Sequence, residues 1–240
     1  MNLVLDIGNT RTKAGIFVND ILKVSLVESD IHSIFEQLKN YSFSRIIVAS
    51  VVKLSEEVLL KISQQGSYIL FEANTPTPVQ NYYKSANTLG SDRLAAVCGG
   101  YLLFKGQDFL VIDAGTCVKY NYTDKNGNFL GGGISPGLAM RYKALHLHTD
   151  KLPLISFDEN YHDLVGNNTQ NSIRMGVQLG LLAEVQGIIN EFLNLYPQLN
   201  IVLTGGDAHY LQRGLKNNIF ADKNLILKGL NSILNYQYLK

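Results

Sequence analysis

The chain has 240 residues, of which 46% are hydrophobic and 17% are charged, and its formal net charge is +1. This composition excludes a disordered chain, and the lack of a basic block excludes the charge pattern of a dedicated nucleic-acid binder. Two cysteines without CxxC spacing exclude a disulfide scaffold, and no apolar run has the length of a membrane span. We therefore expect a globular cytoplasmic protein without a signal peptide, a membrane partner or a nucleic-acid partner.

The first predicted element is a strand–turn–strand unit in the stretch LVLDIGNTRTKAGIF, residues 3–17. Two apolar runs flank a turn in which Gly8 and Asn9 both tolerate positive φ. A simple hairpin does not need Asp6 at the end of one strand and Lys13 early in the next. A plain Asx turn also accounts for the stretch, so a structural and a chemical interpretation both stay open.

Strands and helices then alternate through the rest of the first half. The pattern predicts strands at Ile21–Val27, Arg45–Ala49 and Tyr68–Phe71, and helices at Ile31–Lys39 and Ser55–Gln65, the second with Ser55 as its N-cap. Residues 72–90 are predicted to form an irregular loop, and a loop of this length inside a compact protein is usually functional. A helix is predicted to follow from Ser91 to Phe104.

The second half begins with a repeat of the opening stretch. The sequence FLVIDAGTCVKYNY, residues 109–122, places Asp113 where the first copy has Asp6, about half the chain later. A period this long indicates duplicated domains, because solenoid repeats are shorter. We therefore expect two domains, residues 1–106 and residues 107–240.

The remaining elements complete an α/β pattern. In chain order, they are a strand at Phe129–Ser135, a break at Pro136-Gly137, a helix to about Leu147, one long helix at Thr169–Leu195, a strand at Ile201–Leu203 and a turn at Gly205-Gly206-Asp207. Strands that alternate with helices are typical of α/β architecture with much parallel pairing. Two duplicated halves facing each other predict a central cleft with one Asp-Gly hairpin on each wall.

The two Asp-Gly turns have the chemistry of phosphate sites, because such a turn presents successive backbone N–H groups to an anion. The turn residues are Gly8, Asn9 and Thr10 in the first copy and Gly115 and Thr116 in the second. A carboxylate repels a neighbouring phosphate unless a cation lies between them, and Mg²⁺ binds one or two carboxylates together with phosphate oxygens. Asp6 is therefore a candidate Mg²⁺ ligand, directly or through water, and Lys13 a candidate for neutralising phosphate. The chain has neither a Walker motif nor GxGxxG.

Taken in order, these motifs resemble those of a known superfamily. The stretches DIGNTRTK (6–13), DAGT (113–116) and GGD (205–207) resemble the phosphate and adenosine motifs of the acetate and sugar kinase, Hsp70 and actin superfamily. Within it, GSDR (90–93), GGGISPG (131–137) and the small size are similar to type III pantothenate kinase over the whole chain.

This resemblance implies two duplicated ribonuclease H-like, actin-like ATPase domains facing a central cleft. It implies ATP-dependent phosphorylation of pantothenate to 4'-phosphopantothenate, the first step of coenzyme A biosynthesis. It also implies a homodimer that uses Mg²⁺ with ATP and a monovalent cation, K⁺ or NH4⁺. The predicted long helix has Gly176 and Gly180 four residues apart, so we expect the dimer interface there.

The resemblance also assigns roles to individual residues. Asp92 matches the catalytic proton acceptor, and Asp113 matches the ligand of the monovalent cation. The implied ATP-binding residues are Asp6, Ile7, Gly8, Asn9, Thr10, Arg11, Thr12, Lys13 and Thr116. The implied pantothenate-binding residues are Tyr83, Gly90, Ser91, Asp92, Arg93 and Thr169. The chain departs from the family pattern in one place. The family commonly continues D-x-G-T-x-x-T-x-D, whereas this chain has Lys119 and Asn121 at the last threonine and aspartate positions. This departure bears on the cation preference of the second turn and not on the reaction.

Each candidate also has a plain structural interpretation. Asp92 and Thr169 are typical of helix starts, and Arg93 is typical of surface ion pairs. Tyr83 is a residue type common in protein cores, and Lys13 could lie on an edge strand, where its charge discourages pairing with another chain.

Two other functions stay open beside the kinase. One is a catalytically silent, nucleotide-binding regulatory protein of the same fold. The other is a different enzyme of the superfamily, such as a sugar kinase or a polyphosphatase. The full set of charged candidates argues against the silent regulator: Asp6, Lys13, Asp92, Arg93 and Asp113. The GSDR motif and the short substrate elements of the second half disfavour another enzyme of the superfamily.

Overall fold

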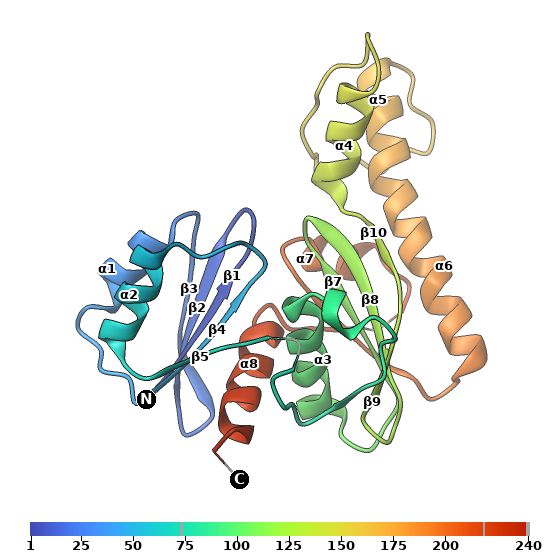
Figure 1. The fold of residues 1–240 in the computed structure, drawn as a ribbon. Helices are drawn as coiled ribbons and strands as arrows, with labels where there is room; N and C mark the ends of the chain where they lie inside the picture. The colour runs from blue at the N-terminus through green and yellow to red at the C-terminus, as the bar shows by residue number, and fades with distance from the viewer. Residues whose placement is uncertain (73, 218, 239–240) are drawn as a thin grey trace. The chain divides into compact units, whose positions relative to one another are not determined.

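The computed structural model of the protein describes residues 1–72, 74–217 and 219–238 (Figure 1). The chain forms two compact α/β units, as the alternation of strands and helices predicted. The first unit comprises Met1–Gly106, Thr123–Gly131 and the segment that begins at Asn224. The second comprises Gln107–Tyr122 and Gly132–Lys223. The division of the chain at residue 106 stays a prediction about its duplication, since two segments of the second half belong to the first compact unit.

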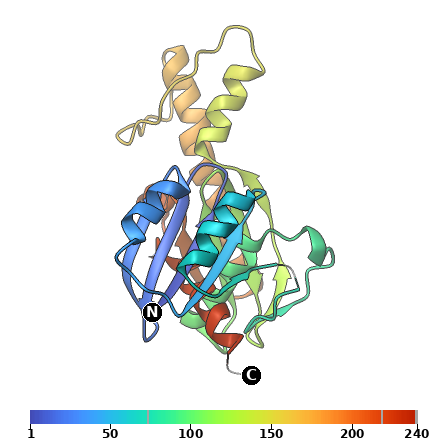
Figure 2. The ribbon, with the colours of Figure 1, turned by 60° about the vertical axis from the view of Figure 1, so that its left-hand side comes forward.

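The first unit is built on a five-stranded sheet in the order β3-β2-β1-β4-β5, labelled in Figure 1. Figure 2 shows the blue strands of this sheet from another side. Its strands are β1 (Asn2–Ile7), β2 (Thr12–Val18), β3 (Ile21–Glu28), β4 (Arg45–Ser50) and β5 (Tyr68–Leu70). The strand β1 pairs antiparallel with β2 and parallel with β4, so its central position explains why Leu3, Val4 and Leu5 are fully buried.

Four helices complete the first unit. They are α1 (Ile31–Leu38), α2 (Glu56–Gln65), α3 (Ser91–Phe104) and α8 (Leu225–Tyr236). The predicted cap of α2 is confirmed, because Ser55 Oγ accepts a hydrogen bond from the Val58 amide at 3.3 Å. Helices α3 and α8 pack backbone to backbone: a Cβ on Gly229 would lie 1.9 Å from the Ala95 carbonyl oxygen.

The segment 72–90 is predicted as an irregular loop, and its described residues, 72 and 74–90, contain two short elements. The strand β6 (Gln80–Asn81) pairs parallel with β9 (Asn128–Gly131), and one 3₁₀ turn, η1, covers Ala86–Thr88. This pairing holds the loop beside Phe129, whose role in the site is described below.

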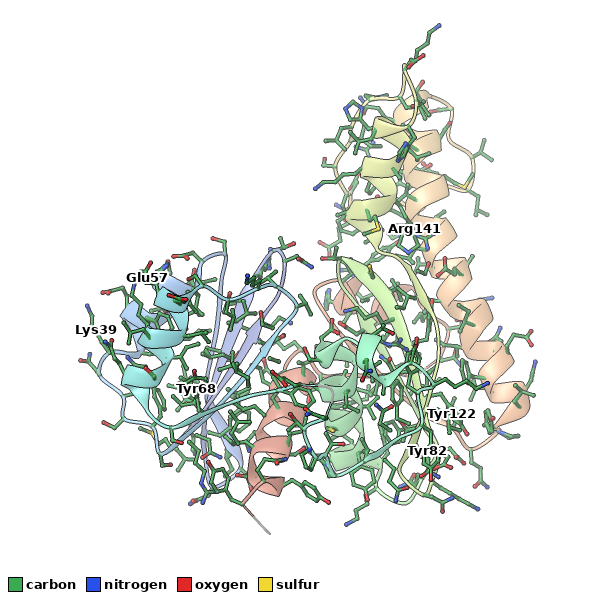
Figure 3. All side chains as sticks on the ribbon, viewed as in Figure 1. Lys39, Glu57, Tyr68, Tyr82, Tyr122 and Arg141 are labelled. Atoms are coloured by element: carbon green, nitrogen blue, oxygen red, sulfur yellow. The ribbon has the colours of Figure 1, made fainter. Side chains whose placement is uncertain are left out.

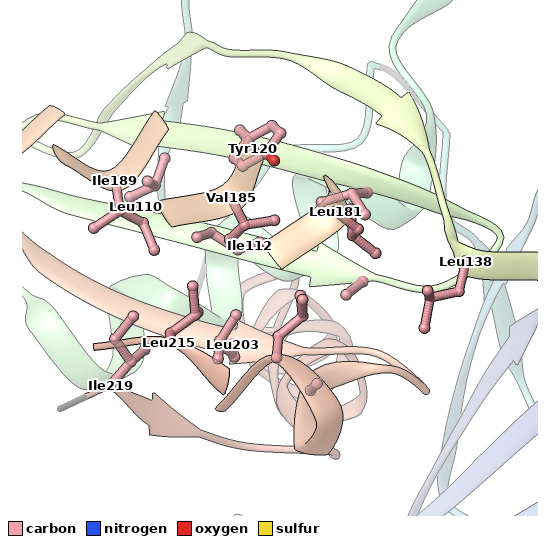
Figure 4. Packing of buried hydrophobic residues seen from close by; sticks show 14 of the residues in the cluster. Leu110, Ile112, Tyr120, Leu138, Leu181, Val185, Ile189, Leu203, Leu215 and Ile219 are labelled. Atoms are coloured by element: carbon pink, nitrogen blue, oxygen red, sulfur yellow. The ribbon is translucent and has the colours of Figure 1, made fainter. Parts of the chain in front are cut away.

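The second unit has the strands β7 (Phe109–Ala114), β8 (Cys117–Thr123), β10 (Ile134–Pro136), β11 (Asn200–Thr204) and β12 (Phe220–Ala221). They follow the order β12-β11-β7-β8, and β10 pairs antiparallel with β8. The helices are α4 (Leu138–Leu147), α5 (Thr169–Arg174), α6 (Gly180–Leu195) and α7 (Ala208–Gly214). The core forms where Leu110 and Ile112 of β7 join Leu181, Val185 and Ile189 of α6 (Figure 4).

The long helix predicted at Thr169–Leu195 is interrupted by a π turn, η2 (Met175–Leu179). In this turn Gln178 is fully buried, and its Oε1 accepts hydrogen bonds from the Tyr142 hydroxyl at 2.7 Å and the Asp158 amide at 3.1 Å. The Gln178 amide group donates to the Asp158 carbonyl at 2.9 Å. Thr169 is not the N-cap as its residue type indicated, because Asn168 Oδ1 accepts the Asn171 amide at 2.9 Å instead.

Candidate active site

The first Asp-Gly hairpin joins β1 and β2 in the first unit. Asp6 is half-buried and its Cα partner across the hairpin is Lys13. The turn closes through a hydrogen bond from the Gly8 amide to the Arg11 carbonyl at 3.0 Å, and the turn is exposed from Asn9 to Arg11. The exposed turn therefore offers backbone N–H groups and the Lys13 ammonium at one end of the sheet.

The positive φ that Gly8 and Asn9 tolerate is not used in this turn, among the described residues. Positive φ occurs instead at Asn19 and Asp20, in the next turn. The requirement at Gly8 is spatial, since a Cβ there would lie 3.0 Å from the Arg11 carbonyl oxygen.

The motif GSDR lies at the N-terminus of α3, also in the first unit. Gly90 is the N-cap residue, Ser91 and Asp92 are half-buried, and Asp92 Oδ1 accepts a hydrogen bond from the Arg93 amide at 2.8 Å. A Cβ on Gly90 would lie 2.6 Å from that Oδ1, so the glycine leaves room for the carboxylate. The helix dipole stabilises the negative charge of Asp92 here.

Arg93 is buried, with 4% of its surface exposed, so its interpretation as a surface ion-pair residue is wrong. Its guanidinium carbon lies 5.2 Å from the ring centre of Tyr83 and 5.7 Å from that of Phe129, and the two rings are stacked with centroids 6.1 Å apart. Cation–π contacts of this kind fix a planar guanidinium in orientation. Tyr83 and Arg93, which the resemblance assigned to the same pantothenate site, are therefore neighbours, and Phe129 is the contact that sequence reasoning missed.

The second hairpin joins β7 and β8 in the second unit. Its turn is short, since the Gly115 amide donates to the Cys117 carbonyl at 3.0 Å, and Thr116 is exposed. Asp113 lies near the end of β7, and its Oδ2 is 3.0 Å from the Lys119 ammonium nitrogen. The implied cation ligand is thus paired with a side chain of its own hairpin.

Thr169, the last implied substrate contact, is the first residue of α5 in the second unit and is exposed. In the same unit, Arg141 of α4, labelled in Figure 3, contacts β10 and α6. It donates to the Ser135 hydroxyl and the Pro136 carbonyl, each at 2.8 Å, and forms an ion pair with Glu184. Burial by itself would raise the pKa of Glu184, but the hydrogen bonds from Ser135 and Arg141 hold that pKa below its usual value. Sequence reasoning missed this network, because its members are far apart in the chain.

A cavity of about 500 Å³ lies beside the GGD motif of the second unit. It is lined by Leu138, Tyr142, Leu154, Phe157 and Asp207 among others. Burial raises the pKa of the Asp207 carboxyl above its usual value. The mainly apolar lining suits a flat ring better than a phosphate group.

In the described part of the chain, no three histidine, cysteine or acidic side chains form a group that could hold a metal ion. Mg²⁺ in kinases needs no such group, since one or two carboxylates and the substrate phosphates suffice. Asp6 beside an exposed turn fits that requirement. None of the helices described here combines the length and apolar character that crossing a membrane requires.

Comparison with known proteins agrees with these motifs. A family model for type III pantothenate kinase matches residues 2–191. A type III pantothenate kinase of Bacteroides fragilis is 43% identical over 239 residues, which are 98% of each chain. Among solved structures, a Baf family transcriptional activator from Campylobacter jejuni matches with a TM-score of 0.65 at 23% identity, covering 99% of this chain and 100% of its own. An N-acetylmannosamine kinase from Listeria monocytogenes matches with a TM-score of 0.54 at 13% identity, covering 98% and 99%. The predicted fold class, that of the actin-like ATPases and sugar kinases, is confirmed.

Proposed function

The chain belongs to the type III pantothenate kinase family, and on this premise we propose that it transfers the γ-phosphoryl group of ATP to the hydroxyl group of pantothenate. The product is 4'-phosphopantothenate, the first intermediate of coenzyme A biosynthesis. The observation that carries the proposal is the start of α3, where a carboxylate and a buried guanidinium, Asp92 and Arg93, are adjacent.

In the proposed reaction Asp92 accepts a hydrogen bond from the pantothenate hydroxyl and aims its oxygen at the γ-phosphorus. Phosphoryl transfer has a loose transition state, so the hydroxyl proton leaves late and Asp92 need not be a strong base. The hydroxyl oxygen forms the new bond to phosphorus, ADP leaves, and Asp92 takes the proton. Arg93, held by the rings of Tyr83 and Phe129, orients the pantothenate carboxylate.

The phosphate groups of ATP are proposed to bind the first turn, where the exposed backbone from Asn9 to Arg11 and the Lys13 ammonium supply donors and charge. Asp6 would hold Mg²⁺, directly or through water, and that ion would supply positive charge between the carboxylate and the phosphates. Thr116 of the second hairpin is proposed as a further phosphate contact, and Thr169 as a further pantothenate contact.

The resemblance also implied K⁺ or NH4⁺ at Asp113. That carboxylate is already within 3.0 Å of the Lys119 ammonium, so the residues present do not fit a bare monovalent cation. No step of the proposed reaction uses one.

We further propose that the protein is a cytoplasmic homodimer whose interface includes α5, η2 and α6. Gly176 and Gly180 have no described neighbour within 4 Å of an added Cβ, so packing within the chain does not explain them. Leu164 and Val165, just before α5, are 78% and 80% exposed. Light scattering should show a dimer at assay concentration, and a fully active monomer would refute this interface.

A coupled ADP-release assay with and without pantothenate tests the proposed function. We expect ADP release that depends on pantothenate. A silent regulatory protein would release no ADP, whether pantothenate is present or absent. A different enzyme of the superfamily would release ADP with another acceptor, or without any acceptor, but would not respond to pantothenate.

A further inference from the structure

The ion pair in the second hairpin occupies the position where family resemblance places a cation ligand. Asp113 Oδ2 and Lys119 Nζ are 3.0 Å apart, and their side chains are 8% and 20% exposed. A carboxylate this buried requires a counter-charge, because removing an unpaired charge from water is more costly than a hydrogen bond can offset. Lys119 supplies that charge from within the chain.

The fold holds Lys119 in this position. It is the third residue of β8, and its neighbours Val118 and Tyr120 are buried in the core of the second unit. Side chains alternate along a strand, so the Lys119 side chain projects from the opposite face. Its Cα also pairs with Ile134 of β10, which fixes the backbone.

The two departures from the family pattern act in the same direction. Lysine at 119 stands where the pattern has threonine, which adds one positive charge, and asparagine at 121 stands where it has aspartate, which removes one negative charge. Asn121 is fully buried, so the lost carboxylate would have needed a partner of its own. Both changes reduce the need for a bound cation at this hairpin.

We propose that the Lys119 ammonium is the resident cation of the second hairpin, and that this enzyme therefore needs neither K⁺ nor NH4⁺. The inference rests on the proposed function. An ammonium group and a monovalent cation carry the same charge, but the side chain is tethered and cannot dissociate. A second cation at Asp113 would lie beside the ammonium, and like charges at that separation repel.

The test compares pantothenate phosphorylation in choline, sodium, potassium and ammonium chloride at one ionic strength. The wild-type rate should be the same in all four salts. Lys119→Thr, which restores the residue of the family pattern, should lose about 10²-fold in choline and recover in potassium. Lys119→Arg keeps the charge and should stay independent of the salt. The control Lys23→Thr, on the exposed edge strand β3, should behave as wild type.

A wild-type enzyme that works only in potassium or ammonium, or a Lys119→Thr enzyme that is fully active in choline, would overturn the inference.

A second measurement does not depend on activity: crystals soaked in thallium(I), a probe for potassium sites, are examined by anomalous scattering. Wild type should show no thallium at Asp113, whereas Lys119→Thr should bind it, and thallium on wild-type Asp113 would overturn the inference. Absence of phosphopantothenate in every salt would refute the proposed function, and the thallium result would still decide the role of Lys119.

Discussion

The β1–β2 and β7–β8 hairpins both have an aspartate one residue before the end of the first strand, at Asp6 and Asp113. In the first hairpin the aspartate is half-buried, and the turn is open and exposed from Asn9 to Arg11. In the second the turn is shorter and the aspartate is buried against Lys119. A longer exposed turn offers more backbone N–H groups to an anion, whereas a buried ion pair supplies a fixed charge. Under the proposed function, one repeated motif binds substrate phosphate through its turn in the first copy, and in the second copy its aspartate is balanced by a charge from within the chain.

The largest expected effect concerns the reacting group, which this account places in the first unit. Asp92→Asn should lower kcat by about 10²–10⁴-fold, because it removes the proton acceptor. It keeps an Oδ1 that can accept the Arg93 amide, so the melting temperature should change little. Steady-state kinetics and thermal melts measure both, with the exposed Asp150→Asn as the matched control. Near-full turnover combined with easy unfolding would make Asp92 a structural residue only.

Substitution of the lysine in each hairpin, Lys13 and Lys119, tests whether the two hairpins have different roles. Lys13→Met should lower kcat/KM for ATP by about 10²-fold with little change in melting temperature, since it removes a charge aimed at phosphate.

Lys119→Met should destabilise the fold in choline buffer by about 3–5 kcal/mol, because it leaves a buried carboxylate unpaired. For a chain of this length, that loss corresponds to a fall of roughly 6–20 °C in melting temperature. The opposite result would contradict these roles: Lys13→Met would destabilise the fold, and Lys119→Met would lower only kcat/KM for ATP.

A smaller effect is expected at Arg93. Lysine cannot reproduce a planar bidentate contact, so Arg93→Lys should raise KM for pantothenate by about tenfold and leave KM for ATP nearly unchanged. Initial rates at varied concentrations of each substrate measure the two constants. A change confined to ATP would move Arg93 to the phosphate side of the site.

The smallest effect concerns Glu184, whose pKa in the folded state is below its usual value. A depressed carboxyl pKa stabilises the fold above the unfolded pKa, and this stabilisation is lost as pH falls through the folded pKa. Glu184→Gln should therefore lower the melting temperature at pH 7 by a few degrees, and by less at pH 3, because this stabilisation is lost as the pH falls. The exposed Glu191→Gln is the control. An equal loss at both pH values would mean that the Glu184 charge does not stabilise the second unit.

Most strands and helix limits could be predicted from the sequence, because apolar runs and caps are local signals. The short strands β6 and β12 were missed, and the strand predicted at Phe129–Ser135 is divided into β9 and β10. The β1 strand, the Ser55 cap and the start of α3 at Ser91 are examples. The π turn could not be predicted, since a one-residue insertion leaves no mark on composition, and it is held by contacts of Gln178 with distant residues. The assignment of α8 to the first unit depends on its packing with α3, which no local pattern records.

The sequence proposed the residues of the candidate site, but it could not predict their contacts. The family motifs identified Tyr83 and Arg93, yet the burial of Arg93 depends on Phe129, from a strand far along the chain. Lys119 was visible as a departure from the family pattern, but only the structure places its ammonium against Asp113. Pairings of this kind depend on distances across a hairpin and not on residue types alone.

The most direct test of the central claim is transfer of label from [γ-³²P]ATP to pantothenate in a choline buffer free of potassium and ammonium. We predict one labelled product, phosphopantothenate, formed in equal amount to ADP. Label that appears only as inorganic phosphate, or no transfer in this buffer and in potassium alike, would contradict it.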